Sequence, residues 1–86
     1  MSEATVDSLV VSARAALLRD DAKAALELAR EALSIDPSIA RAHAVLSRAL
    51  LDLRRPRGAR VEAEKAIAAD PTCARGHEAL GFVQRF

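Results

Sequence analysis

The segment DPSIARAHAVL at residues 36–46 returns 34 residues later as DPTCARGHEAL at residues 70–80. The paired Asp-Pro and His-x-x-Leu matches carry most of this signal, and over residues 25–47 the same shift gives nine identities in 23 pairs. An internal period of this length is typical of a repeat protein, in which each supersecondary unit stacks on the next. The sequence therefore predicts a stack of equivalent units.

Each unit is expected to be helical. The 86 residues include twenty alanines and eleven leucines but only two phenylalanines and no tryptophan or tyrosine, and alanine is the best helix former. Apolar residues recur at three- and four-residue spacing in five stretches, which predicts five helices within one domain spanning 1–86. These stretches are 6–17, 25–33, 39–53, 59–67 and 73–80.

Short polar segments separate the expected helices, so consecutive helices should be antiparallel. Asp20 and Asp21 are suited to capping the second helix, whose first N–H groups need an acceptor. Asp36-Pro37 should end that helix and start the third, since proline removes a donor yet is accommodated in a first helical turn. The segment RPRG at 55–58 breaks the pattern before the fourth helix.

A 34-residue helix–turn–helix unit with small residues at fixed places and proline between units resembles the tetratricopeptide repeat. The residues that carry this resemblance are Ala13, Ala25, Ala32, Pro37, Leu46, Ser47, Ala59, Ala66, Pro71, Leu80 and Gly81. The resemblance implies an all-α, right-handed superhelical stack of antiparallel helix pairs, an α-solenoid. Its units would be repeat one at about 6–39, repeat two at about 40–73 and a half repeat at 74–86. Family positions that usually hold large aromatics carry His43, His77, Leu50, Ala29 and Ala63 here.

No motif predicts catalysis, so the chain is expected not to be an enzyme and to need no cofactor or metal. Glycine-rich phosphate loops and nucleophile motifs are missing from the sequence. His43 and His77 are related by the repeat itself, which favours packing over acid–base chemistry or metal binding, and Cys73 is expected to be a small buried thiol. Carboxylates such as Glu62 and Glu64 are interpreted as solvated.

The family resemblance implies a concave groove lined by the first helix of each unit. The residues expected there include Arg14, Arg41, Ala44, Arg48, Arg75 and Glu78. Guanidinium groups bind carboxylates through two parallel hydrogen bonds, so an acidic peptide of a protein partner is the expected ligand. The alternative is that these arginines only keep the face soluble. At the positions of the chaperone-tail clamp found in one subfamily, only Arg75 matches, so that activity is not expected.

The last expected helix lacks a partner and carries Leu80, Phe82, Val83 and Phe86. An exposed apolar end of this kind marks an interface, so self-association, as a dimer, is expected; a piece of a longer array is the alternative. The first alternative function is therefore a homo-oligomeric assembly module, whose groove and apolar C-terminal helix bind another copy of the chain instead of a foreign peptide. A second alternative function is nucleic-acid binding through Arg54, Arg55, Arg57 and Arg60. With a net charge of +1 and no aromatic stacking platform, that function is the less favoured.

The expected location is the cytoplasm. A single cysteine cannot form an internal disulfide, the N-terminal MSEAT lacks the apolar run of a secretory signal, and no apolar run approaches the ~18 residues of a membrane span. Eleven arginines against two lysines, beside so much alanine, indicate a GC-rich bacterial genome.

Overall fold

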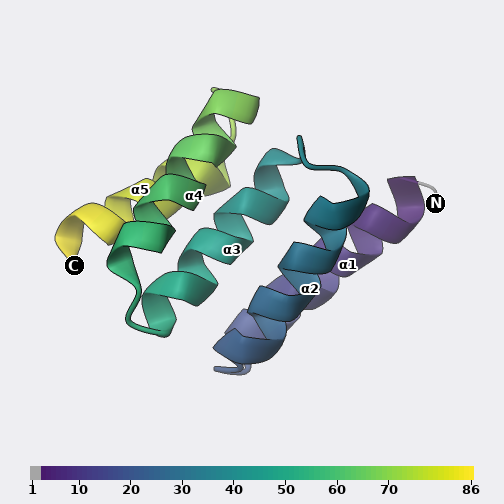
Figure 1. The fold of residues 1–86 in the computed structure, drawn as a ribbon, viewed down its shortest axis with the longest axis horizontal. Coiled ribbons are helices and arrows are strands. Elements are labelled where there is room, and N and C mark those ends of the chain that lie inside the picture. The colour runs from purple at the N-terminus through teal and green to yellow at the C-terminus, as the bar shows by residue number, and fades with distance from the viewer. Residues whose placement is uncertain (1–2) are drawn as a thin grey trace.

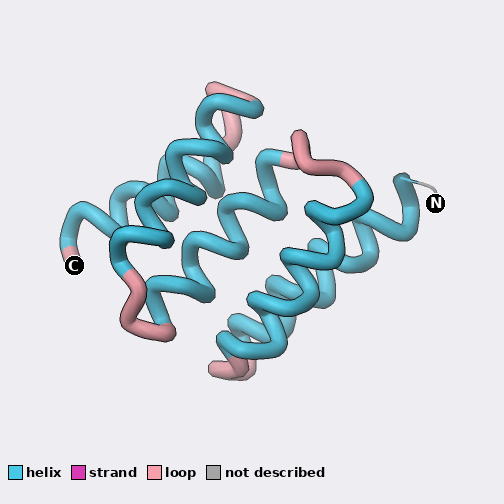
Figure 2. The backbone as a smooth tube through the Cα atoms, in the orientation of Figure 1, coloured by secondary structure: helices cyan, strands magenta, loops and turns pink. Residues whose placement is uncertain are grey.

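Five helices make up almost all of the chain that the structure, a computed structural model, describes, which is residues 3–86 with side chains from Thr5 onward. They are α1 (Glu3–Leu18), α2 (Ala22–Ile35), α3 (Ala40–Asp52), α4 (Pro56–Ala69) and α5 (Ala74–Arg85). No strand occurs among these residues (Figure 2). The prediction of an all-α chain with five helices is confirmed, while the handedness of the stack and the repeat boundaries remain predictions.

The helices form two antiparallel pairs, α1 with α2 and α3 with α4, and α5 follows (Figure 1). Helix α3 is central, because it contacts each of the other four helices. Among the described helices, α5 packs on α3 and α4 alone. The arrangement places the first helix of each unit, α1, α3 and α5, along one side of the stack.

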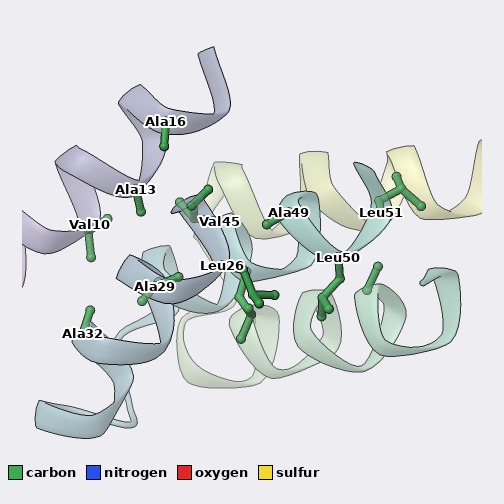
Figure 3. Packing of buried hydrophobic residues seen from close by; sticks show 14 of the residues in the cluster. Val10, Ala13, Ala16, Leu26, Ala29, Ala32, Val45, Ala49, Leu50 and Leu51 are labelled. Atoms are coloured by element: carbon green, nitrogen blue, oxygen red, sulfur yellow. The ribbon is translucent and has the colours of Figure 1, made fainter. Parts of the chain in front are cut away.

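Alanine is the commonest buried residue of the described chain. Eight alanines on α1, α2 and α4 are completely buried: Ala13, Ala16, Ala25, Ala29, Ala32, Ala59, Ala63 and Ala66. Figure 3 shows Val10 of α1 and Ala32 of α2 pointing toward one another across one such contact. The largest fully buried side chains are only valine and serine, Val10 and Ser47. Small side chains let helix axes approach closely, so the core is thin but dense.

The two Asp-Pro turns have the same hydrogen bonds. The Asp36 carboxylate accepts from the Ser38 hydroxyl at 2.7 Å and from its backbone N–H at 3.0 Å. Asp70 accepts from Thr72 in the same way and at the same distances. These bonds, the hydroxyl first, lower the pKa of both aspartates from the usual 3.8.

The prediction that proline starts the following helix was wrong. Pro37 and Pro71 lie in the turns, and α3 and α5 begin three residues later at Ala40 and Ala74. Each aspartate side chain bonds to a residue inside its turn, Ser38 or Thr72, and the proline carbonyls accept no backbone hydrogen bond. These carbonyls accept hydrogen bonds from histidines of the next helix.

The other two turns share a backbone conformation. Asp20 and Arg54 both have positive φ, 60° and 63°, at equivalent places after α1 and α3. Asp21 is the N-cap of α2 and accepts from the Ala24 N–H at 3.1 Å, so Asp20 ends α1 rather than capping α2. Pro56 is the first residue of α4, where its missing N–H costs nothing, so 56–58 belongs to the helix and not to a break.

One polar pair lies inside the second unit. The His43 ring is buried, with Nδ1 2.8 Å from Glu62 Oε1 and Nε2 2.8 Å from the Pro37 carbonyl oxygen. Both partners are acceptors, so each ring nitrogen has to donate to use them. The Glu62 side chain is only 13% exposed. The packing role predicted for His43 is confirmed, but the prediction that Glu62 is solvated was wrong because α3 covers it.

The first unit provides a natural control for this pair. Leu9 and Leu28 occupy the positions of His43 and Glu62 one period earlier. We expect Glu62→Leu alone to lower the free energy of unfolding by about 2 kcal/mol, since it leaves a buried ring nitrogen without an acceptor. His43→Leu with Glu62→Leu should recover most of that loss. Urea denaturation of the four proteins of this cycle measures the coupling; strictly additive effects would contradict it.

The lowered pKa values of Asp36 and Asp70 predict that the free energy of unfolding decreases at acidic pH. Their folded-state pKa values are lowered, so their contribution is full above the usual 3.8 and is lost as the pH falls through the folded-state values. Ser38→Ala with Thr72→Val should raise both pKa values and flatten the loss of stability below about pH 4. Carboxyl NMR titration measures this. Ser34→Ala, which removes a hydroxyl bonded only to the Glu31 carbonyl, is the control.

The positive φ of Arg54 predicts a stabilising substitution. Glycine has no Cβ to clash in the left-handed region, so Arg54→Gly should raise the free energy of unfolding by about 1 kcal/mol. The control is Arg55→Gly, because Arg55 has a φ of −119° and gains nothing from glycine. Equal effects of the two substitutions would show that the backbone conformation is not the cause.

Candidate functional site

A groove of about 570 Å³ runs along the side formed by α1, α3 and α5. It is lined by Val10, Val11, Arg14, Leu17, Leu18, Asp20, Arg41, Ala44, Val45, Arg48, Asp52, Arg75 and Glu78. Most of these residues recur at equivalent positions of successive units, such as Arg14 and Arg48, which are 34 residues apart. The groove is therefore built by stacking the same helix face three times.

The six residues named above for the groove lie in its lining. Leu51, Ala79, Phe82 and Arg85 occupy family groove positions as well but are not part of the lining. The sequence reasoning missed Leu18, Asp20 and Asp52. A signal was present for two of them, because Leu18 and Asp52 follow Arg14 and Arg48 by four residues and so lie on the same helix face. Asp20 reaches the groove because its left-handed backbone turns the chain there.

Two of the groove arginines already have carboxylate partners. Arg41 Nη2 lies 2.7 Å from Asp7 Oδ1 on α1, and both side chains are 55% exposed. Arg75 Nη1 lies 3.6 Å from Glu78 Oε1 one helical turn along α5, again with both side chains about half exposed. Exposed pairs of this kind contribute little to stability. They neutralise the groove near the first turns of α3 and α5.

Arg48 has an aromatic partner instead. Its Cζ lies 3.9 Å from the centre of the Phe82 ring, which Arg85 also approaches at 5.0 Å. The Arg48 Nε is buried and has no hydrogen-bond partner among the described residues. A buried N–H without an acceptor is uncommon and costly in folded proteins. The contact with the Phe82 ring fixes the position of the Arg48 guanidinium, but it uses none of the hydrogen-bond donors of that group.

Arg14 is the equivalent of Arg48 on α1. It is partly buried, lines the groove, and forms no hydrogen bond or ion pair with any described residue. Beside it are the two most exposed apolar side chains of α1, Val11 at 63% and Leu18 at 82%. This part of the groove therefore combines two arginines that lack a carboxylate with an uncovered apolar surface.

The four residues expected to drive self-association do not form one exposed face. Val83 is 7% exposed and belongs to the core cluster. Phe82 is half-buried under Arg48, and Leu80 is half-buried. Phe86 alone is well exposed, at 59%, with Arg54 Cζ 5.9 Å from its ring centre. Packing against α3 and α4 is the reason that Val83 is withdrawn from the surface.

The basic cluster of the α3–α4 turn is exposed: Arg54, Arg55, Arg57 and Arg60. Arg54 faces a second hollow, of about 710 Å³, that is also lined by Asp20, Asp21 and Asp52. Charges of both signs therefore meet beside the cluster.

Cys73 and His77 are the other residues that the sequence offered as possible metal ligands or reactive groups. Cys73 is buried, as expected, and unpaired. The packing predicted for His77 was wrong: its ring is exposed, because no described helix covers that side of α5, and its Nε2 lies 2.8 Å from the Pro71 carbonyl oxygen. Within residues 3–86, no three His, Cys, Asp or Glu side chains are grouped so that they could hold a metal ion. The described helices include none long and apolar enough to cross a bilayer.

Comparison with known proteins agrees with this geometry. A search of curated proteins found no match. The family model described as tetratricopeptide repeat matches residues 16–81, which covers the last turn of α1, all of α2, α3 and α4, and much of α5. With its 34-residue period, its antiparallel pairs and this match over most of its length, the chain belongs to the tetratricopeptide repeat family.

Proposed function

We propose that this chain binds an acidic peptide segment of a partner protein in the groove formed by α1, α3 and α5, and that it does so without chemistry of its own. Tetratricopeptide repeats generally mediate protein–protein interaction and are typically non-enzymatic. The observation that carries the proposal is the pair Arg14 and Arg48. Both line the groove and neither has a carboxylate partner among the described residues.

The ligand chemistry follows from what these arginines lack. A guanidinium holds five N–H donors, and a charged acceptor gives the strongest hydrogen bonds to them. Arg48 is already held in place by Phe82, so ordering it on binding costs little conformational entropy.

The charges along the groove limit the ligand further. Near the first turns of α3 and α5, positive and negative side chains are already paired. Toward the C-terminal ends of α1 and α3, Arg14 and Arg48 come next, and Asp20 and Asp52 lie after them. This order favours a peptide with acidic residues at one place rather than a continuous acidic run, because a longer run would meet Asp20 and Asp52. Val11 and Leu18 favour an apolar residue next to the acidic one.

The test is binding of a fluorescent peptide in which two glutamates are flanked by leucines, against the same peptide with glutamine. We expect the glutamate peptide to bind more tightly, and Arg14→Gln to weaken it roughly tenfold because a charged hydrogen-bonded pair is lost. The measurement is fluorescence anisotropy at low and moderate salt, and salt should weaken binding.

Arg30→Gln is the matched control, since Arg30 is an exposed arginine of α2 outside the groove. Equal binding of the two peptides, or equal effects of the Arg14 and Arg30 substitutions, would overturn the proposal. An RNA oligonucleotide that competes more strongly than the peptide would favour the nucleic-acid alternative. A dimer in sedimentation that dissociates when peptide is added would favour the assembly alternative.

A further inference from the structure

Two rows of equivalent residues cross the groove, and each row takes one residue from α1, α3 and α5. The members of a row are 34 positions apart in the sequence. The Asp7 row consists of Asp7, Arg41 and Arg75, and the Arg14 row consists of Arg14, Arg48 and Phe82. The four arginines line the groove. Each row therefore has two arginines and one residue of another type.

In both rows the residue that is not arginine contacts the arginine of the central helix α3. Asp7 Oδ1 of α1 lies 2.7 Å from Arg41 Nη2. The centre of the Phe82 ring on α5 lies 3.9 Å from Arg48 Cζ. The two α3 arginines are thus held from opposite sides of the stack, one by a carboxylate and the other by an aromatic ring.

These two contacts have opposite consequences for a ligand carboxylate. The Asp7 carboxylate accepts a hydrogen bond from Arg41, offsets its charge and would repel a second carboxylate. An aromatic ring interacts with the face of a guanidinium, so the N–H donors at the edge of Arg48 and its charge stay available. The Arg14 row is therefore the more favourable place for an acidic side chain.

We propose that Asp7 and Phe82 determine where in the groove an acidic side chain of the partner binds, because Asp7 blocks Arg41 and Phe82 positions Arg48 for the carboxylate. This inference rests on the proposed function, since it assigns the register of the same ligand. Neither residue belongs to the groove lining, so each acts through the arginine that it contacts. Asp7 limits the groove to one acidic subsite, and its removal opens a second one at Arg41.

The spacing of the two subsites defines the peptides for the test. Arg41 and Arg48 are seven residues apart on α3, which is two helical turns and about 10 Å along the axis. An extended peptide covers that distance with three residues. The peptides are therefore the glutamate peptide described above and two longer versions, with a third glutamate three residues before or three residues after the pair, so that both chain directions are tested.

The first arm measures the affinity of these peptides by fluorescence anisotropy. In the parent protein the third glutamate should change the affinity less than about twofold at either end. In Asp7→Asn one of the two longer peptides should bind about fivefold more tightly than the short one, because Arg41 then has free donors and an uncompensated charge. Glu31→Gln is the matched control, since it removes the same charge from an exposed position of α2 outside the groove.

The second arm tests Phe82 through the preference for the glutamate peptide over the glutamine peptide. Phe82→Leu keeps an apolar side chain but offers no ring to Arg48, and it should reduce this preference about fivefold. In an Arg48→Gln background the same substitution should reduce it no further. A purely structural role would weaken both peptides equally. Phe86→Leu is the control, because Phe86 lies outside the groove lining and its ring is 5.9 Å from Arg54 Cζ.

The outcomes separate this inference from the proposed function. If the parent prefers glutamate but Asp7→Asn gains no more from the third glutamate than Glu31→Gln does, the inference is overturned and the proposed function stands. Equal weakening of both peptides by Phe82→Leu also overturns the inference. If the parent shows no preference, the proposed function fails. A glutamate preference that then appears only in Asp7→Asn would support the block of Arg41 by Asp7, and its absence would overturn both.

Discussion

Completely buried alanines lie where α1 meets α2 and where α3 meets α4, beside a few larger side chains such as Val10 and Leu50. A Cβ methyl occupies so little space that the backbones of paired helices come close, and the whole stack depends on this approach. The same holds between α4 and α5, where a Cβ on Gly76 would lie only 3.1 Å from the Cβ of Ala66. A larger residue at such a place forces the helices apart, because a dense core has no free volume.

A core of small residues has a consequence for its polar groups. Each buried alanine removes little apolar area from water, so a few well-placed hydrogen bonds have a large share in determining which helix pairs with which. Ser47 binds the Ala59 carbonyl and His43 binds Glu62, and both bonds join α3 to α4. The equivalent positions of the first unit are apolar, Ala13 and Leu9. The two units therefore form the same helix contact in different ways, the first with apolar side chains and the second with hydrogen bonds.

The groove follows from the 34-residue period. Because the first helix of each unit lies beside the first helix of the unit before it, equivalent residues such as Arg14 and Arg48 line one groove. Arg14 and Arg48 differ in their surroundings although their positions are equivalent. Arg48 has Phe82, whose ring takes the place of a third arginine in the period, whereas Arg14 has neither a carboxylate nor an aromatic partner among the described residues.

The sequence by itself determined the period, the five helices, the burial of the small residues and most of the residues that line the groove, since all of these follow from local spacing and its repetition. Tertiary structure decided the rest. Glu62 is buried only because α3 covers it, Val83 is withdrawn from the surface by packing, and Pro37 accepts from His43 across a turn. Whether a side chain is buried or paired depends on which other segment packs against it. The local spacing of residues does not reveal contacts between segments that are far apart in the chain.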